Sequence, residues 1–355
     1  MKGILLHGGH GTRLRPLTHT GPKQLLPIAN KPMSQYCIES MKESGVKEIV
    51  IIIGGAGSNK VKEYYGNGEK LDVRISYIEQ DYPRGIAHAI RLCKEFVDND
   101  RFLVFLGDNI IQKPITDYVK NFEKSDAAAS ILLCEVDNPS RFGIAEIKEG
   151  KILRIMEKPK NPPSNLAVTG IYLLTPKIFD VIDRLKPSWR NELEITDALH
   201  MLLEEKNKIT YNMITDYWKD TGTPDDIINA NGAILEKMNP YFYAKKEGDV
   251  SIEGKVMIGE GTILKNGAKI VGPAIIGRNC IIESDAKIGP NASIGDNSRL
   301  AKCEISNSIV MADCNIECNI RIKDSIIAYN SSINQDSEKQ NGKIFLLGEG
   351  TKISL

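Results

Sequence analysis

The sequence predicts an α/β domain built on a mainly parallel sheet, followed by a parallel β-helix. Three observations lead to this. Apolar strand segments alternate with amphipathic helical segments from residue 1 to about 238, a pattern typical of βαβ units. Aliphatic residues then recur at every sixth position from Ile252 to Leu300, as in a β-helix. At 355 residues the chain exceeds the size of a single hydrophobic core, so two domains are expected.

Strands and helices alternate through the first part of the chain. The expected strands are 4–6, 48–53, 73–78 and 102–106, and the expected helices are 31–44, 59–65 and 86–96. In parallel sheets of this type, ligands bind beyond the carboxyl ends of the strands. The glycine-rich segment after the first strand and Asp108 after the last strand both fall at such an end.

The second part of the chain follows a six-residue repeat. Its aliphatic positions are Ile252, Ile258, Leu264, Ile270, Ile276, Ile282, Ile288, Ile294 and Leu300, then, in a slipped register, Ile305, Val310, Ile316, Ile322, Ile327 and Ile333. Such a repeat builds coils with three flat faces, about five coils here. We expect an α/β domain over 1–238, a linker over 239–249 and the β-helix over 250–355, with the segment 347–353 packed on its end.

Composition argues against several classes of protein. Lys+Arg and Asp+Glu both total 46, so the net charge is zero and no basic field would attract nucleic acid. The apolar runs are too short to span a bilayer, and no signal region precedes the first strand. Seven cysteines without a Cys-x-x-Cys pair favour reduced thiols. We expect a cytoplasmic protein that acts on small molecules, without a nucleic-acid or membrane partner.

A glycine-rich turn follows the first strand. It reads Gly8-Gly9-His10-Gly11-Thr12-Arg13, and Lys23 stands in the next loop. Glycine lets the backbone approach phosphate oxygens, and successive N–H groups form an anion site. Arg13 and Lys23 would place two cations against a triphosphate. The spacing fits neither the dinucleotide fingerprint nor the Walker A loop. The alternative is a strand-to-helix turn that binds no ligand.

Several separated motifs make the chain resemble the sugar-phosphate nucleotidyltransferases. They are GGxGTRLxP (8–16), PKQLLP (22–27), NKPM (30–33), IEQ and GxAHA (78–89), LGDN (106–109), RFGIAE (141–146), EKP (157–159), VTGIY (168–172), ELEITD (192–197) and WxDTGT (218–223). The likeness covers nearly the whole chain and is strongest to the long-form glucose-1-phosphate thymidylyltransferases. It implies a Rossmann-like nucleotidyltransferase domain, a left-handed β-helix, and transfer of a nucleoside monophosphate from dTTP to glucose 1-phosphate with release of pyrophosphate.

The resemblance also implies roles for individual residues. Those implied to bind the nucleotide are Gly8, Gly9, Gly11, Thr12, Arg13, Lys23, Gln24, Gln80, Gly85 and Asp108. Those implied to bind the sugar phosphate are Gly143, Glu157, Lys158, Val168, Thr169, Gly170 and Arg190. Those implied to act in catalysis are Arg13, Lys23, Asp108 and Lys158. Asp108 and Asp220 would together hold Mg²⁺, which prefers one or two carboxylates plus phosphate oxygens. Glutamine amides offer the donor and acceptor that match a pyrimidine imide edge.

Three histidines stand out against this background. His7 and His10 replace the small residues that the family usually carries in the turn. His7 would crowd the ribose or hydrogen-bond to it, and a protonated His10 would add charge beside the phosphates. His88 lies in a helical stretch and is expected to be structural.

Other functions stay open at this point. UTP could replace dTTP, another hexose 1-phosphate could replace glucose 1-phosphate, or the chain could be a non-catalytic regulatory subunit. Acyl transfer by the β-helix would need a histidine base, and all five histidines stand at or before position 200. We therefore expect no histidine-dependent acyl transfer. The β-helix is expected to mediate contacts in a homo-oligomer or to cap the catalytic domain.

Overall fold

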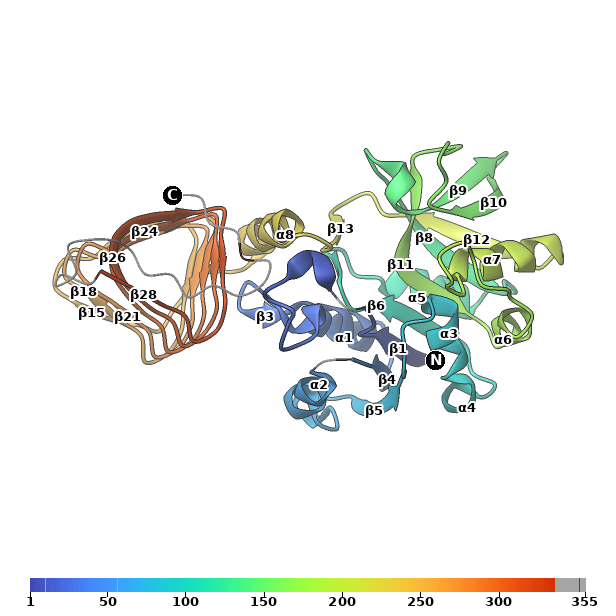
Figure 1. Ribbon diagram of the computed structural model, residues 1–355, viewed down its shortest axis with the longest axis horizontal. Helices are drawn as coiled ribbons and strands as arrows, with labels where there is room; N and C mark the ends of the chain where they lie inside the picture. Colours follow the sequence, from blue (N-terminus) through green and yellow to red (C-terminus); the bar gives the residue numbers. More distant parts are fainter. Residues whose placement is uncertain (10, 56, 336–350, 352–355) are drawn as a thin grey trace. The chain divides into compact units, whose positions relative to one another are not determined.

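The computed structural model describes residues 1–9, 11–55, 57–335 and 351 (Figure 1). By its internal contacts the chain divides into two compact units. The first consists of Met1–Gly11, Thr20–Leu25 and Met33–Asp220. The second consists of Thr12–His19, Leu26–Pro32 and Thr221–Leu355. The domains expected over 1–238 and 250–355, with a linker over 239–249, stay a prediction.

The first unit is built on a nine-stranded, mixed sheet that is parallel toward one end, from β6 to β5. The path runs β10-β9-β11-β6-β1-β4-β5, with β8 paired to β11 and β12 paired to β8. Its strands are β1 (Lys2–Leu6), β4 (Glu48–Ile53), β5 (Arg74–Glu79), β6 (Phe102–Leu106), β8 (Ala129–Glu135), β9 (Gly143–Lys148), β10 (Lys151–Glu157), β11 (Leu166–Leu174) and β12 (Ile209–Met213). Strands β6, β1, β4 and β5 are mutually parallel. The predicted α/β fold is confirmed.

Helices cover both faces of this sheet. They are α1 (Met33–Glu43), α2 (Ser58–Tyr65), α3 (Ile86–Arg91), α4 (Lys94–Val97), α5 (Thr116–Glu123), α6 (Lys177–Ile182) and α7 (Ile195–Glu204). Along β1, Ile4 and Leu6 pack in the core with α3, α6 and α7, whereas Leu5 packs in the core with α1, α2 and α5. Because successive side chains of a strand point to opposite faces, β1 is apolar throughout.

Two elements differ from the expected ones. The helix expected over 31–44 begins only at Met33, because Lys31–Pro32 forms strand β3, which pairs with β2 (Pro27–Ile28). The helix expected over 86–96 is divided into α3 and α4. The described residues also form four short 3₁₀ helices: η1 (Thr12–Leu14), η2 (Lys23–Leu25), η3 (Glu69–Leu71) and η4 (Pro139–Arg141).

The second unit carries helix α8 (Pro224–Lys237) and a left-handed parallel β-helix. The strands of the β-helix are β14 (Tyr241–Phe242), β15 (Lys245–Glu247), β16 (Ser251–Glu253), β17 (Val256–Ile258), β18 (Ile263–Lys265), β19 (Lys269–Val271), β20 (Ala274–Ile276), β21 (Ile281–Ile282), β22 (Lys287–Ile288), β23 (Ala292–Ile294), β24 (Arg299–Ser306), β25 (Ile309–Val310), β26 (Asn315–Lys323), β27 (Ile326–Ile327) and β28 (Ser332–Asn334). Strands β14 and β15 lie in the segment expected as a linker and pair with β17 and β18. The expected packing of 347–353 concerns residues that, apart from residue 351, lie outside the described ones.

The register of the β-helix follows the sequence repeat. Val256 pairs with Ala274, and Ala274 with Ala292, so one coil takes 18 residues (274 − 256 and 292 − 274). Ser293 then pairs with Ile309, which shortens the coil to 16 residues (309 − 293), where the sequence register slips. The aliphatic positions face inward: Ile258, Ile276, Ile294 and Val310 are completely buried.

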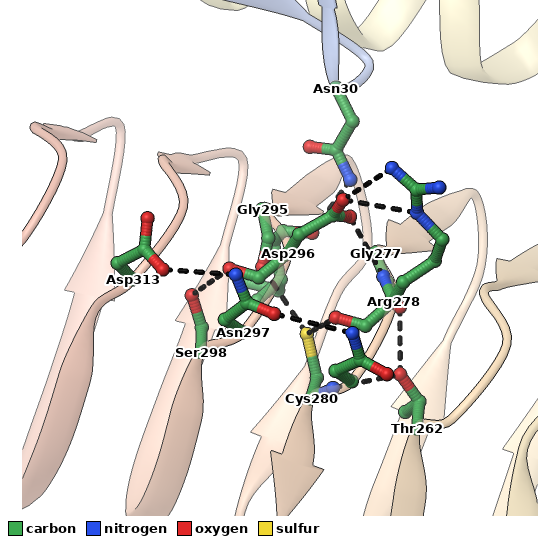
Figure 2. Close-up of polar contacts among 12 residues, drawn as sticks. Asn30, Thr262, Gly277, Arg278, Cys280, Gly295, Asp296, Asn297, Ser298 and Asp313 are labelled. Atoms are coloured by element: carbon green, nitrogen blue, oxygen red, sulfur yellow. Dashed lines mark hydrogen bonds and ion pairs between the residues drawn. The ribbon is translucent and has the colours of Figure 1, made fainter.

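Polar ladders run along the corners of the coils. Asn279 donates to Asn297 at 3.4 Å. Asn297 in turn donates to Asp313 at 3.0 Å, as Figure 2 shows. These three residues have positive φ angles, a conformation that Asn and Asp tolerate better than other residues with a Cβ. Inside the coil, the Cys280 thiol lies 3.2 Å from the Gly295 carbonyl, and burial raises its pKa to about 11. All seven cysteines are free thiols.

In the described part of the chain, no helix has the length and apolar character needed to cross a bilayer.

Candidate active site

The glycine turn begins where β1 ends, at the carboxyl edge of the parallel strands. Gly9 has φ 100° and Gly11 has φ 57°, conformations that residues with a Cβ adopt only at a cost. A Cβ at Gly9 would meet no atom within 4 Å. The glycines are therefore needed for backbone shape. His10 and its expected charge lie outside the described residues.

Lys23 and Asp108 form a largely buried ion pair at this edge of the sheet. Lys23 precedes β2 in the 3₁₀ helix η2, and Asp108 follows β6. The Lys23 ammonium donates to Asp108 Oδ2, and the two side chains are only 12% and 14% exposed. Burial by itself would raise the pKa of Asp108, but Lys23 and the hydrogen bond from Asn109 outweigh it and lower that pKa. The carboxylate therefore stays charged.

Strand register brings the second predicted metal ligand next to the first. Strand β13 (Trp218–Asp220) pairs antiparallel with β7 (Asn109–Ile111), which places Asp220 opposite Asn109 and one residue from Asp108. Trp218 Nε1 donates to Asn109 Oδ1 at 2.8 Å, and Asn109 Nδ2 donates to Asp108 Oδ1 at 3.0 Å. Within the described chain, no group of three or more His, Cys, Asp or Glu side chains is placed to hold a metal. A carboxylate pair suits an ion whose remaining ligands are phosphate oxygens.

Two glutamine side chains converge on Gly8 of the turn. Gln24 Nε2 donates to the Gly8 carbonyl at 3.0 Å. The Gln24 Oε1 atom is buried and has no hydrogen-bond partner within the described residues. Gln80 Oε1 lies 3.8 Å from the position that a Cβ on Gly8 would occupy. The structure thus places the amide nitrogen of Gln24 and the amide oxygen of Gln80 beside the turn.

Gly85 closes the loop that leads from β5 into α3. It has φ 99°, and a Cβ at this position would lie 2.3 Å from the Leu193 carbonyl oxygen. The backbones are also joined by hydrogen bonds from Ala87 N to Leu193 O at 3.1 Å and from Leu193 N to Arg84 O at 2.8 Å. No side chain fits here, because the clash would be with backbone rather than with a movable group.

His7, which directly follows β1, is buried. It is 1% exposed, and neither ring nitrogen has a hydrogen-bond partner among the described residues. Its ring meets Tyr65 edge-on at 6.2 Å. Burial lowers the pKa of His7 to about 3, although the Asp108 charge raises it in part. The ring is therefore neutral at pH 7.

The residues predicted for the sugar phosphate gather around Glu157. Its Oε1 lies 3.4 Å from an Arg190 guanidinium nitrogen and 3.6 Å from Lys158 Nζ. Thr196 donates to Oε2 at 3.1 Å. Burial and the nearby Glu194 raise the pKa of Glu157, while Lys158, Thr196 and Arg190 lower it in part. The cluster mixes two cations with a carboxylate whose affinity for protons is increased.

Gly143 and Gly170 lie close to side chains that hold Glu157 and Asp108. A Cβ at Gly143 would lie 2.6 Å from Thr196 Cγ2 and 3.8 Å from Val168 Cβ. A Cβ at Gly170 would lie 2.7 Å from Asn109 Nδ2, the amide that also holds Asp108. Thr169 is completely buried and donates to the Leu132 carbonyl at 2.9 Å. Its hydroxyl therefore joins strand β11 to strand β8.

Thr12 and Arg13 belong to the second unit. The Arg13 guanidinium nitrogens lie 3.2 and 3.3 Å from the position that a Cβ on Gly222 would occupy. Arg13 thus contacts the DTGT motif that also contains Thr223, the N-cap of α8, whose side chain accepts from Asp226 N.

Comparison with known families agrees with this geometry. A family model described as nucleotidyl transferase matches residues 2–237. The chain belongs to the nucleotidyl transferase family. A second model, described as the GMPPB C-terminal domain, matches residues 270–354 of this nucleotidyltransferase.

Relatives extend the match to the full length. A low-salt glycan biosynthesis nucleotidyltransferase, Agl11 of Haloferax volcanii, is 42% identical over 357 residues that span 100% of both chains. A glucose-1-phosphate thymidylyltransferase of Streptomyces antibioticus is 39% identical over 100% of this chain and 99% of its own. A Bacillus anthracis protein assigned as a glucose-1-phosphate thymidylyltransferase, solved with sucrose, is 43% identical with a TM-score of 0.64, over 68% of this chain and 98% of its own.

Several residues of the nucleotidyltransferase site received no role from sequence. Asn109 and Trp218 orient Asp108, Thr196 donates to Glu157, and Glu194 shifts its pKa. All four stand inside the motifs LGDN, WxDTGT and ELEITD. Their place in these motifs is the signal that the sequence offers. The structure shows which neighbour each of them contacts.

Proposed function

We propose that this nucleotidyltransferase transfers a thymidylyl group from dTTP to glucose 1-phosphate, with dTDP-glucose and pyrophosphate as products. The observation that carries the proposal is the buried Lys23–Asp108 pair beside the glycine turn. It supplies a cation and a carboxylate with a lowered pKa, and both would act on a triphosphate held by the turn. The similarity to the Streptomyces and Bacillus thymidylyltransferases supports the choice of substrates.

The reaction joins two polyanions, so charge neutralisation and positioning are its main requirements. An oxygen of the sugar phosphate attacks the α-phosphorus, a new P–O bond forms, and the bond to the bridging oxygen of pyrophosphate breaks. In this proposal the N–H groups of Gly8, Gly9, Gly11 and Thr12 receive the triphosphate. Lys23 and Arg13 neutralise it and the leaving pyrophosphate.

Asp108 and Asp220 suit a magnesium ion, since the strand register brings them near each other and both are carboxylates. Bound there, Mg²⁺ would offset phosphate charge that the two basic residues leave uncompensated. Asn109 would keep the Asp108 carboxylate oriented, because its amide is itself fixed by Trp218.

The Glu157 cluster suits the sugar phosphate. Lys158 and Arg190 would bind the phosphate, and Glu157 would accept hydrogen bonds from glucose hydroxyls. Gly143, Val168, Thr169 and Gly170 would line the pocket with backbone. A Cβ at Gly143 or Gly170 would clash with Thr196 or Asn109. Thr196 would keep Glu157 in place.

Base recognition would fall to Gln24, Gln80 and the backbone of Gly85. The two amides lie beside Gly8 and can address an imide edge. Thymine and uracil share that edge, so UTP is the second candidate donor. Faces of the β-helix would supply homo-oligomer contacts, as solenoids commonly do.

Pyrophosphate release tests the proposal over a grid of nucleoside triphosphates and hexose 1-phosphates with Mg²⁺. We expect the highest kcat/KM for dTTP with glucose 1-phosphate. A maximum with UTP or with another hexose 1-phosphate would replace the substrates but keep the reaction. Absence of pyrophosphate with every pair would contradict catalysis and favour a regulatory subunit.

A further inference from the structure

Gln80 and His88 form a buried hydrogen-bonded pair between the end of β5 and helix α3. Gln80 Nε2 lies 2.7 Å from His88 Nδ1, and the residues are 6% and 5% exposed. An amide nitrogen has hydrogens but no available lone pair, so it must donate and Nδ1 must accept. The imidazole ring is therefore neutral, with its proton on Nε2.

This bond determines which end of the Gln80 amide faces the glycine turn. With Nε2 held by His88, the opposite atom, Oε1, points toward Gly8, 3.8 Å from where a Cβ would lie. The terminal torsion of glutamine is broad and roughly two-fold. An amide without the His88 bond could therefore turn over and present NH₂ in place of oxygen.

We propose that His88 is a positioning residue that holds Gln80 Oε1 toward the nucleobase and thereby selects pyrimidines that carry N3–H. This inference rests on the proposed function, in which Gln80 contacts the base. Uracil and thymine have a donor at N3, whereas cytosine has an acceptor there. A fixed carbonyl oxygen binds the first two and repels the third, whereas a freely turning amide would accept all three.

The surroundings of His88 favour the neutral ring that this arrangement needs. His88 lines a cavity of about 260 Å³ together with Tyr82, Arg84, Arg91, Pro187, Asn191 and Leu193. The cavity residues from the 187–193 segment carry no charge. Burial lowers the pKa of His88, Arg91 and Arg84 lower it further, and Asp81 raises it in part. Protonation would turn Nδ1 into a donor, which can bind Gln80 only through Oε1 and would reverse the amide.

His88→Leu and His88→Gln test the role of the acceptor. The measurement is kcat/KM for dTTP, UTP and dCTP, by pyrophosphate release with glucose 1-phosphate. We expect the preference for dTTP over dCTP to fall about tenfold in His88→Leu, the effect of one lost hydrogen bond. His88→Gln should keep the preference, since its Oε1 can accept from Gln80 Nε2. His200→Gln, on α7, is the matched control and should behave as wild type.

A pH series gives a second reading that does not require the leucine variant to fold. In the wild type the preference should decline once the pH falls below the lowered pKa of His88, because the ring then becomes protonated. In His88→Gln it should stay constant. The inference is overturned if His88→Leu keeps the preference within twofold, or if the wild-type preference declines at low pH and that of His88→Gln declines equally.

Gln80→Leu separates this inference from the proposed function. If Gln80→Leu raises the KM for dTTP while both His88 variants behave as wild type, the base contact holds and the role of His88 is rejected. If Gln80→Leu leaves every constant unchanged, the base contact itself is rejected. Should turnover with glucose 1-phosphate be absent, calorimetric Kd values for dTTP and dCTP report the same preference and test His88 independently of catalysis.

Discussion

At the residue scale, the buried side chains of Asp108 and His7, after β6 and β1, show how hydrogen-bond and ion-pair partners determine whether a buried group is charged. Asp108 is charged because Lys23 and Asn109 more than offset its burial. His7 is uncharged because its ring nitrogens have no hydrogen-bond partner within the described residues and burial dominates. The difference has consequences for both activity and stability.

Asp108→Asn should abolish measurable turnover, a loss of at least about 10²–10³-fold, because it removes a charge from the phosphate site. It should also lower the free energy of unfolding by about 3 kcal/mol, since Lys23 would stay buried without a counter-charge. Steady-state kinetics and urea denaturation measure the two effects. Asp72→Asn is the control, because Asp72 pairs with Lys47 while 76% exposed. Unchanged turnover in Asp108→Asn would exclude the proposed metal role.

His7 should make the wild type lose stability as pH falls. Its pKa is about 3 in the folded chain and 6.5 in the unfolded chain. Between these values the unfolded chain binds more protons, so stability rises with pH. From pH 7.5 to 5, the wild type should lose about 2 kcal/mol more than His7→Leu in urea denaturation. Equal losses in the two proteins would contradict a buried neutral His7.

At the element scale, loops are held by backbone contacts that no side chain could replace. The loop between β5 and α3 is closed by Leu193, which accepts from Ala87 N and donates to Arg84 O. In the same way, the pairing of β13 with β7 holds Asp220 opposite Asn109. In both cases, segments distant in sequence are joined by hydrogen bonds between main-chain atoms.

Gly85→Ala should therefore be more harmful than glycine replacement in an open turn. The new Cβ would lie 2.3 Å from Leu193 O, in addition to the positive φ. We expect a loss of about 2–4 kcal/mol of stability and a higher KM for the nucleotide. Gly150→Ala is the matched control, with φ 73° and no atom within 4 Å, and should cost only about 1 kcal/mol. Equal effects would show that backbone conformation alone matters at Gly85.

At the scale of the whole molecule, the second unit assembles segments that are far apart in the chain. Asn231 of α8 is completely buried, and its Oδ1 accepts from Ala29 N at 2.8 Å and from Ser293 Oγ at 2.7 Å. Asn30 donates to the Ile294 carbonyl at 2.6 Å, on the coil that Figure 2 shows. The segment Leu26–Pro32, which begins inside the PKQLLP motif, is thus anchored to α8 and to the β-helix.

Asn231→Ala should loosen this anchor. It leaves the Ala29 N–H and the Ser293 hydroxyl without their acceptor, for a loss of about 2–5 kcal/mol. Ser293→Ala should cost about 1 kcal/mol. Because both changes remove one shared bond, the double variant should lose less than the sum of the single variants. Urea denaturation tests the cycle, and strict additivity would show that Asn231 does not couple these segments.

Local pattern in the sequence was sufficient for many elements. The strands expected over 48–53 and 102–106 agree with β4 and β6 to the residue, and the six-residue repeat predicted the coils and the change in their length. These features depend on periodicity between near neighbours, since the inward-facing positions must all be apolar. Motif resemblance also named Lys23, Asp108, Glu157 and Arg190, which lie in the clusters described above, although their roles stay proposals.

Contacts between distant segments were decided only by the tertiary structure. They include the grouping of Thr12–His19 and Leu26–Pro32 with the β-helix, the position of Asp220 opposite Asn109, and the Gln80–His88 bond. A hydrogen bond between two such groups leaves no period in the sequence, because it depends on how whole strands and helices pack. Sequence by itself therefore determined the kind of fold and the residue types for its chemistry, whereas packing decided which of those residues meet.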